Sequence, residues 1–155
     1  MPVANIHVLA GHPRPVLQQL VSEAAHALAR SVDAPVDRLQ VWITEVDPGL
    51  YAIAGVPADQ VLTQKPRAEI EIPLIKMTLL EGRSLEVLHR VIADMSAVTA
   101  RVLGGDPKRV RVEINHVSAD RWGIGGVPAS QARAAELAAR AGCIRRADAT
   151  GPGAP

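Results

Sequence analysis

The sequence predicts an α/β fold in which two tandem β-α-β units form a four-stranded sheet with two helices on one face. The first observation is an internal repeat: a shift of 71 residues places Pro2 on Pro73, and the two copies of "GVPA" then coincide without a gap. A period this long exceeds that of solenoid repeats and indicates duplication of a small domain. The second observation is that each half alternates between strand-like and helix-like hydrophobic patterns. Because a half of about 60 residues is marginal on its own, we expect the two halves to pack together.

Four segments show the alternation of apolar and polar residues that is typical of half-buried strands. Residues 3–9 and 74–80 open the two halves, and residues 39–46 and 110–117 come later in each half. A strand, a helix and a second strand joined by a long crossover form a right-handed parallel pair. We therefore expect one such pair in each half. The other face of the joined sheet would be uncovered, and apolar residues there would require a partner.

Between its two strands, each half has a segment with one apolar stripe at helical spacing. The stripe consists of Leu17, Leu20, Val21, Ala24 and Leu28 in the first half and of Leu88, Val91, Ile92, Met95 and Thr99 in the second. Ser84 is suited to cap the second helix. Each stripe predicts a helix that packs on the sheet.

These patterns divide the chain into four parts. We expect a first β-α-β half over residues 1–56, a linker over residues 57–72, and a second half over residues 73–130. Residues 131–155 are expected to form a short helix and a disordered tail, because the end of the chain is rich in Ala, Gly and Pro. The short helix is predicted over residues 129–141, and "GIGG" before it predicts a hairpin or turn.

Composition narrows the range of functions. The chain has 155 residues, of which 48% are hydrophobic and 21% charged, as in one soluble globular unit or two very small ones. The formal net charge of +1 predicts neither nucleic-acid nor membrane binding. The single cysteine, Cys143, and five scattered histidines indicate no disulfide, no metal and no cofactor. Since no apolar stretch is long enough to span a membrane and the signal-peptide pattern is absent, we expect a cytoplasmic protein.

Pro2 and Pro73 occupy equivalent positions, but only Pro2 can become a free amine. A proline at the start of a strand is usually tolerated simply because it has no N–H to pair. If Met1 is removed, however, Pro2 becomes the N-terminal secondary amine, whereas Pro73 remains inside a peptide bond. Among apolar neighbours such an amine loses solvation of its cation, so its pKa falls toward neutrality and it can accept a proton.

The second half, with "IPLIKMTLLEGRS" and "RVRVEINHVSADRWGIGG", resembles the 4-oxalocrotonate tautomerase group of the tautomerase superfamily, as does the first half with "PVANIHVLAG" and "YAIAG". The resemblance covers residues 2 to about 130. It implies a tautomerase/MIF-like fold of β-α-β units, assembled as hexamers or as trimers of fused pairs. It also implies that an N-terminal proline is the catalytic base.

Four residues match the functional positions of that family. Pro2 matches the catalytic proline, Arg83 the arginine of the "EGR" turn, Arg111 the second-strand arginine, and Trp122 the aromatic wall. The resemblance therefore implies that Pro2, Arg83 and Arg111 are catalytic and that both arginines and Trp122 bind the substrate. Guanidinium groups bind carboxylates in a bidentate manner and stabilise the oxyanion of an enolate.

The first half departs from the family at the equivalent places. His12 stands at the position of the turn arginine and Gln40 at that of the strand arginine, whereas Tyr51 keeps an aromatic residue. One half has thus kept the amine and the other the arginines. We expect one working site per chain, assembled from both halves, and an inert equivalent beside Pro73.

The expected function is tautomerisation of an unsaturated 2-hydroxy or 2-oxo carboxylic acid by a homotrimer. One alternative is a dehalogenase, hydratase or decarboxylase of a three-carbon acid, for which a further carboxylate would activate water. His116 stands in the second half where the first has Glu45, which weakens this alternative, although Glu113 is near in sequence. The other alternative is a non-enzymatic duplicated scaffold.

Overall fold

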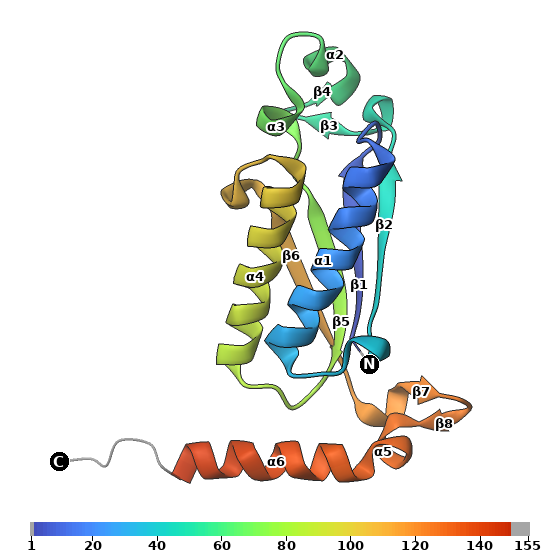
Figure 1. The fold of residues 1–155 in the computed structure, drawn as a ribbon, viewed down its shortest axis with the longest axis vertical. Helices are drawn as coiled ribbons and strands as arrows, with labels where there is room; N and C mark the ends of the chain where they lie inside the picture. Colours follow the sequence, from blue (N-terminus) through green and yellow to red (C-terminus); the bar gives the residue numbers. More distant parts are fainter. Residues whose placement is uncertain (1, 150–155) are drawn as a thin grey trace, which may run out of the picture.

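The computed structural model describes residues 2–149 and contains a four-stranded sheet with the order β2-β1-β5-β6 (Figure 1). β1 (Val3–Leu9) pairs in parallel with β2 (Gln40–Val46), and β5 (Leu74–Leu80) pairs in parallel with β6 (Arg111–Val117). The two halves join through the central strands β1 and β5, which are antiparallel. The predicted fold of two tandem β-α-β units is confirmed.

Two long helices, α1 (Arg14–Val32) and α4 (Leu85–Leu103), lie side by side on one face of the sheet (Figure 1). α4 begins as predicted, because the Ser84 side chain accepts a hydrogen bond from the Val87 backbone N–H at 3.4 Å. It ends at Gly104, whose φ of 70° is the left-handed conformation that closes many helices.

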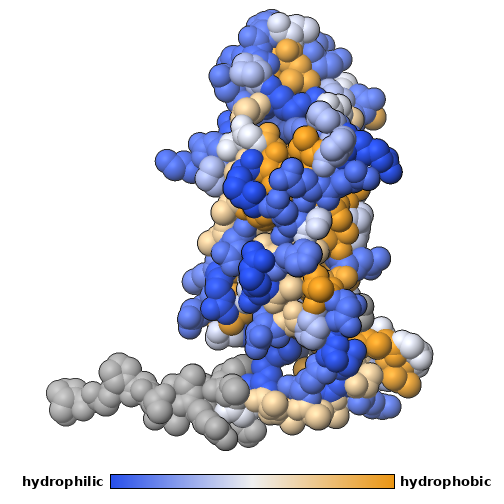
Figure 2. All heavy atoms as spheres, viewed as in Figure 1, coloured by the Kyte–Doolittle hydropathy of each residue, from blue (hydrophilic) through white to orange (hydrophobic). Residues whose placement is uncertain are grey.

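The core lies between the helices and the sheet. The buried faces of β1 and β5 meet the predicted helical stripes, and the side chains include Ile6, Leu20, Leu28, Ile75, Met77, Val91 and Met95. The outer surface of the helical layer is mainly hydrophilic (Figure 2). Both halves contribute to one core, as expected for units too small to be stable alone.

The other face of the sheet is uncovered, as expected, and many of its side chains are polar. Thr44 donates a hydrogen bond to Asn5 across β1 and β2 at 3.0 Å, and Lys76 lies 3.9 Å from Glu113 across β5 and β6. Trp42 is a large apolar exception, with 40% of its surface exposed. A partner on this face would therefore make mostly polar contacts.

Each end of the sheet carries a small unit with the same hairpin. At one end lie β3 (Ala52–Ile53), β4 (Val56–Pro57), α2 (Ala58–Leu62) and α3 (Arg67–Ile70); at the other lie β7 (Gly123–Ile124), β8 (Val127–Pro128) and α5 (Ala129–Ala132). Short 3-10 turns complete these connections at Val36–Arg38, Pro48–Leu50, Pro107–Arg109 and Ala119–Arg121. The "GIGG" hairpin is confirmed, and its glycines Gly125 and Gly126 have φ values of 58° and 87°.

The chain ends in α6 (Ala134–Ala149), which crosses the end of the sheet where β1 starts (Figure 1). The single helix predicted over residues 129–141 is instead two segments, α5 and the longer α6. The last part of the predicted tail, residues 150–155, lies outside the described residues. Among residues 2–149, no helix is both long enough and apolar enough to cross a membrane.

Candidate active site

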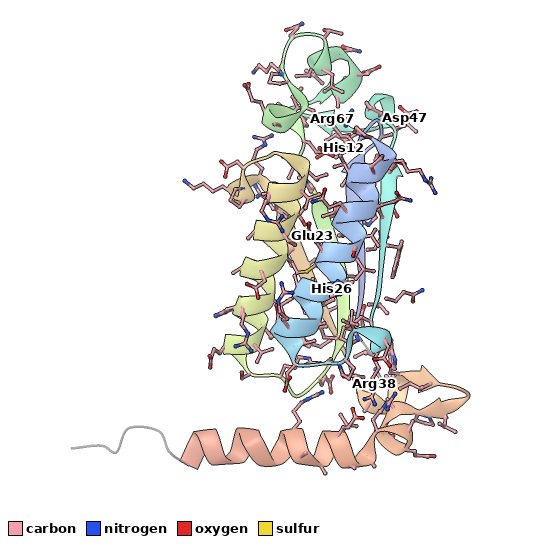
Figure 3. All side chains as sticks on the ribbon, in the orientation of Figure 1. His12, Glu23, His26, Arg38, Asp47 and Arg67 are labelled. Carbon is pink, nitrogen blue, oxygen red and sulfur yellow. The ribbon has the colours of Figure 1, made fainter. Side chains whose placement is uncertain are left out.

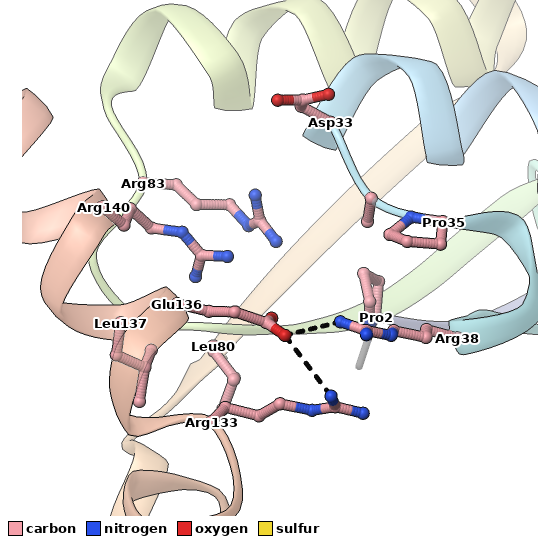
Figure 4. A pocket seen from close by; sticks show the side chains of 11 residues that line it. Pro2, Asp33, Pro35, Arg38, Leu80, Arg83, Arg133, Glu136, Leu137 and Arg140 are labelled. Carbon is pink, nitrogen blue, oxygen red and sulfur yellow. Dashed lines mark hydrogen bonds and ion pairs between the residues drawn. The ribbon is translucent and has the colours of Figure 1, made fainter.

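The antiparallel pairing of the central strands brings Pro2 and Arg83 together. Val3 of β1 lies opposite Thr78 of β5, so the start of β1 meets the end of β5. Pro2, which is buried, immediately precedes β1, and Arg83 follows β5 after a short turn. Both line one cavity of about 60 Å³ at this end of the sheet (Figure 4).

Arg83 is partly buried in this cavity and keeps an unused donor. Its Nη1 donates a hydrogen bond to the Val32 carbonyl at the C-terminus of α1, at 2.9 Å. Its Nε is shielded from solvent and has no hydrogen-bond partner within the described part of the chain. Burial lowers the pKa of the Arg83 guanidinium to about 10; the nearby Arg140 lowers it too, and Asp33 raises it. Arg83 therefore remains a cation near pH 7, with capacity to bind an anion.

Three residues at the C-terminal side of this cavity are absent from the sequence-based site. Arg133, just before α6, and Glu136 and Arg140, on α6, line the cavity together with Leu137. Their spacing of three, four and seven residues places them on one face of a helix, which the sequence could have indicated, but it gives no sign that this face lines the Pro2 cavity. Glu136 accepts hydrogen bonds from Arg38 at 2.7 Å and from Arg133 at 3.3 Å (Figure 4).

The cavity has an excess of positive charge. Four arginines and two carboxylates line it: Arg38, Arg83, Arg133, Arg140, Asp33 and Glu136. Glu136 forms ion pairs with Arg38 and Arg133, and no ion pair joins it to Arg83 or Arg140 in the described part of the chain. A cavity with this charge distribution favours an anionic ligand.

Arg111 lies at the opposite end of the sheet. It begins β6 opposite Leu74, the first residue of β5, whereas Pro2 lies near the other end of β5, since Val3 is opposite Thr78. Seven strand residues separate these ends by about 20 Å. Arg111 Nη1 donates to the Lys108 carbonyl at 2.9 Å. Arg111 and Pro2 of one chain therefore do not share a cavity.

Trp122 lies at the same end of the sheet as Pro2, beyond the end of β6. Its side chain is half-buried and is not among those that line the Pro2 cavity. Its carbonyl accepts a hydrogen bond from Ala129 at 2.7 Å, and Tyr51 makes the same contact with Ala58. The repeat has thus conserved the backbone role of this aromatic position.

The equivalent position beside Pro73 is filled by the linker. The Glu71 carboxylate lies 2.7 Å from His12 Nε2 and accepts a hydrogen bond from the Leu9 backbone N–H at 2.6 Å. Arg67 donates to the Leu9 and Ala10 carbonyls, next to His12 (Figure 3). Pro73 has no free amine, and His12, the counterpart of Arg83, is already in contact with an internal carboxylate.

Comparison with known proteins gives the family. The family described as "Tautomerase enzyme" matches residues 73–132. A probable tautomerase of Ralstonia nicotianae is 40% identical over 62 residues, which are 40% of this chain and 89% of that protein. This chain belongs to the tautomerase family.

Further comparisons define the branch of the tautomerase family. A 2-hydroxymuconate tautomerase of Pseudomonas putida is 37% identical over 60 residues, which cover 39% of this chain and 95% of that protein. The crystal structure of a native fused 4-oxalocrotonate tautomerase (4-OT) is 26% identical, with a TM-score of 0.73. The match covers 83% of this chain and 97% of the fused 4-OT chain. This tautomerase is therefore an isomerase of the fused 4-oxalocrotonate tautomerase type. The match of residues 73–132 stops just before α6 begins at Ala134.

Proposed function

We propose that this enzyme tautomerises an unsaturated 2-hydroxy or 2-oxo carboxylic acid, with Pro2 as general base once Met1 has been removed. The observation that carries the proposal is that Pro2 and Arg83, which come from different halves, line one cavity. Pro2 is buried, and burial disfavours the cationic form of an amine. The cavity therefore combines a base with a cation that can hold a carboxylate.

The proposed reaction begins with the 2-hydroxy acid. The Pro2 amine takes the hydroxyl proton, and the electron pair of the O–H bond forms the C2 carbonyl while the double bond shifts along the chain. The resulting Pro2 cation then returns its proton to a carbon atom, which completes the 2-oxo isomer. Positive charge next to the developing enolate stabilises the intermediate most strongly when water is excluded.

The repeat supports a carboxylate-binding role for Arg83. His12 is the counterpart of Arg83 in the first half, and it contacts a carboxylate, that of Glu71. Arg83 itself makes no hydrogen bond to a carboxylate among residues 2–142. A substrate carboxylate is the group that would take this place beside Arg83.

We assign Arg111 and Trp122 to the site across a subunit boundary in a homotrimer. One fused 4-OT structure is described as an asymmetric trimer and another as a symmetric trimer. Arg111 lies too far from Pro2 to act within its own chain, as the strand register requires. The cavity of about 60 Å³ is also smaller than the roughly 300–1,000 Å³ typical of small-molecule sites. A neighbouring chain that completed the site would account for both observations.

Hydration or dehalogenation of a three-carbon acid is less well supported. Glu136 is a carboxylate in the Pro2 cavity, as a water-activating mechanism would require. However, the hydrogen bond from Arg38 lowers the pKa of the Glu136 carboxyl, which makes it a weaker base. Tautomerisation through proton transfer by Pro2 is therefore better supported than hydration or dehalogenation.

Two measurements test the proposal. Mass spectrometry of the purified protein should show loss of Met1, since a retained Met1 would block the amine. Turnover should then be compared with 2-hydroxymuconate, phenylenolpyruvate and a 3-haloacrylate. We expect ketonisation of one of the two enols to be fastest; release of halide as the dominant reaction would favour the alternative.

A further inference from the structure

The guanidinium groups of Arg83 and Arg140 lie side by side in the Pro2 cavity, although they come from different elements (Figure 4). Arg83 follows β5, and Arg140 lies on α6. Their proximity is electrostatically unfavourable, since each cation disfavours the other, and Arg140 contributes to the lowered pKa of Arg83. An arrangement of this kind is stabilised when an anion binds both groups.

Each arginine also has a donor that lacks an acceptor. Arg83 Nε and Arg140 Nη1 are shielded from solvent, and neither has a hydrogen-bond partner among the residues the structure describes. Shielded polar groups are normally paired, because a donor removed from water without an acceptor destabilises the fold. Two carboxylates line the cavity: Glu136 is already bound to Arg38 and Arg133, and Asp33, which raises the pKa of Arg83, makes no hydrogen bond to either arginine among the described residues. The missing acceptor therefore has to come from outside this set of residues.

One ion pair links α6 to the end of the sheet where the cavity lies. Glu136 joins α6 to Arg38, which lies in the 3-10 turn Val36–Arg38 just before β2. Arg140 is one helical turn beyond Glu136, on the same face of the helix. Leu137, between them, lines the cavity as well. α6 thus forms one wall of the site within the same chain.

We propose that Arg140 is a substrate-binding residue that holds the substrate carboxylate jointly with Arg83, next to Pro2. This inference rests on the proposed function and adds a residue from α6, which begins after the segment that matches the tautomerase family. Two guanidinium groups supply parallel N–H donors to one carboxylate, and charge-assisted bonds of this kind are stronger than neutral ones. Binding of the carboxylate would also remove the repulsion between the two arginines.

Kinetics of Arg140→Gln test this role. With phenylenolpyruvate, which has one carboxylate, KM should rise about tenfold or more while kcat changes much less, because a charge-assisted bond to the substrate is lost. Arg140→Lys should restore part of the affinity. With the methyl ester of phenylenolpyruvate, Arg140→Gln and the unmodified enzyme should have similar KM values. The matched control is Arg14→Gln, at an exposed arginine of α1 distant from the cavity.

A binding measurement separates this inference from the proposed function. Cinnamate carries a carboxylate but cannot tautomerise, and its Kd from calorimetry should be about tenfold weaker for Arg140→Gln. If Pro2→Ala retained full turnover, the proposed function would fail, yet the cinnamate comparison would still decide the role of Arg140. Equal cinnamate affinity in the two proteins would overturn the inference.

Thermal stability excludes a merely structural role. Without ligand, Arg140→Gln should melt at the same temperature as the unmodified enzyme or slightly higher, because it removes a like charge from Arg83. The double variant Arg83→Gln/Arg140→Gln should lose less cinnamate affinity than the two single losses combined, as expected for groups that hold one carboxylate. A lower melting temperature with unchanged affinity would show that Arg140 only supports the fold.

Discussion

His12 and Glu71 lie 2.7 Å apart at the end of the sheet where Pro73 precedes β5, and only 7% and 6% of their side-chain surfaces are exposed. His12 belongs to the first half and Glu71 to the linker, so this contact ties the linker to the end of β1. The equivalent contact in the second half would be between Arg83 and a substrate carboxylate. One position of the repeat has therefore become structural, while the other has kept an open cation.

Loss of the Glu71 carboxylate should destabilise the fold. Glu71→Ala leaves the Leu9 N–H without its acceptor and His12 without its partner, and we expect a loss of about 3 kcal/mol in the free energy of unfolding. Glu71→Gln should cost less, because its amide oxygen can still accept from Leu9. Urea denaturation measures both, with the exposed Glu69→Gln as control. Unchanged stability of Glu71→Ala would contradict a structural role.

Pro2 and Pro73 should differ in their effect on turnover. Pro2→Ala replaces a preoriented secondary amine with a primary amine, so we expect the fold to persist and tautomerisation to fall by roughly 10²-fold or more. Pro73→Ala, in an inert position, should cost far less. Circular dichroism establishes folding and steady-state kinetics give the rates. Comparable losses in the two folded variants would contradict a single working site per chain.

Local periodicity and the repeat were enough to predict the strands and the two long helices. The Ser84 cap could be predicted from its residue type and its place before the second helical stripe. A site that combines Pro2 with Arg83 was expected only from the family resemblance, because no local pattern specifies that β1 and β5 pair in the antiparallel direction. The roles of Glu71 and Arg140 could not be predicted, because the repeat has diverged there. Glu71 lies in a linker without strong periodicity, and α6 follows a Gly- and Pro-containing hairpin whose path the sequence does not specify.

Arg83 and Arg111 should be distinguishable by kinetics. Arg83→Ala and Arg111→Ala should each cost about 2–4 kcal/mol in kcat/KM if the arginine also stabilises developing charge. An arginine that only anchors the carboxylate should mainly raise KM, whereas one directed at the enolate oxygen should lower kcat. From its position in the cavity, we expect Arg83 to affect chiefly KM and Arg111 chiefly kcat. Unchanged constants in both variants would mean that these arginines are only surface charges.

The assembly should be a homotrimer in which Arg111 acts on the Pro2 site of another chain. The separation of about 20 Å along the sheet prevents the two residues of one chain from meeting. The uncovered sheet face is largely polar, so we expect hydrogen bonds such as those of Asn5 and Lys76 to contribute to the interface. The halves are similar but unequal, so the ring should have true threefold symmetry and only approximate twofold symmetry.

Light scattering combined with mixing of inactive variants tests this assembly. Pro2→Ala and Arg111→Ala should each be weakly active alone. Mixed, dissociated and reassembled, they should regain part of the activity, because some sites then combine an intact Pro2 with an intact Arg111 from a neighbour. The control is a mixture of Pro2→Ala with Pro2→Ala/Arg111→Ala, which has no intact Pro2 and should recover nothing. A monomeric mass, or no recovery despite subunit exchange shown by mass spectrometry, would contradict a shared site and leave Arg111 outside the chemistry.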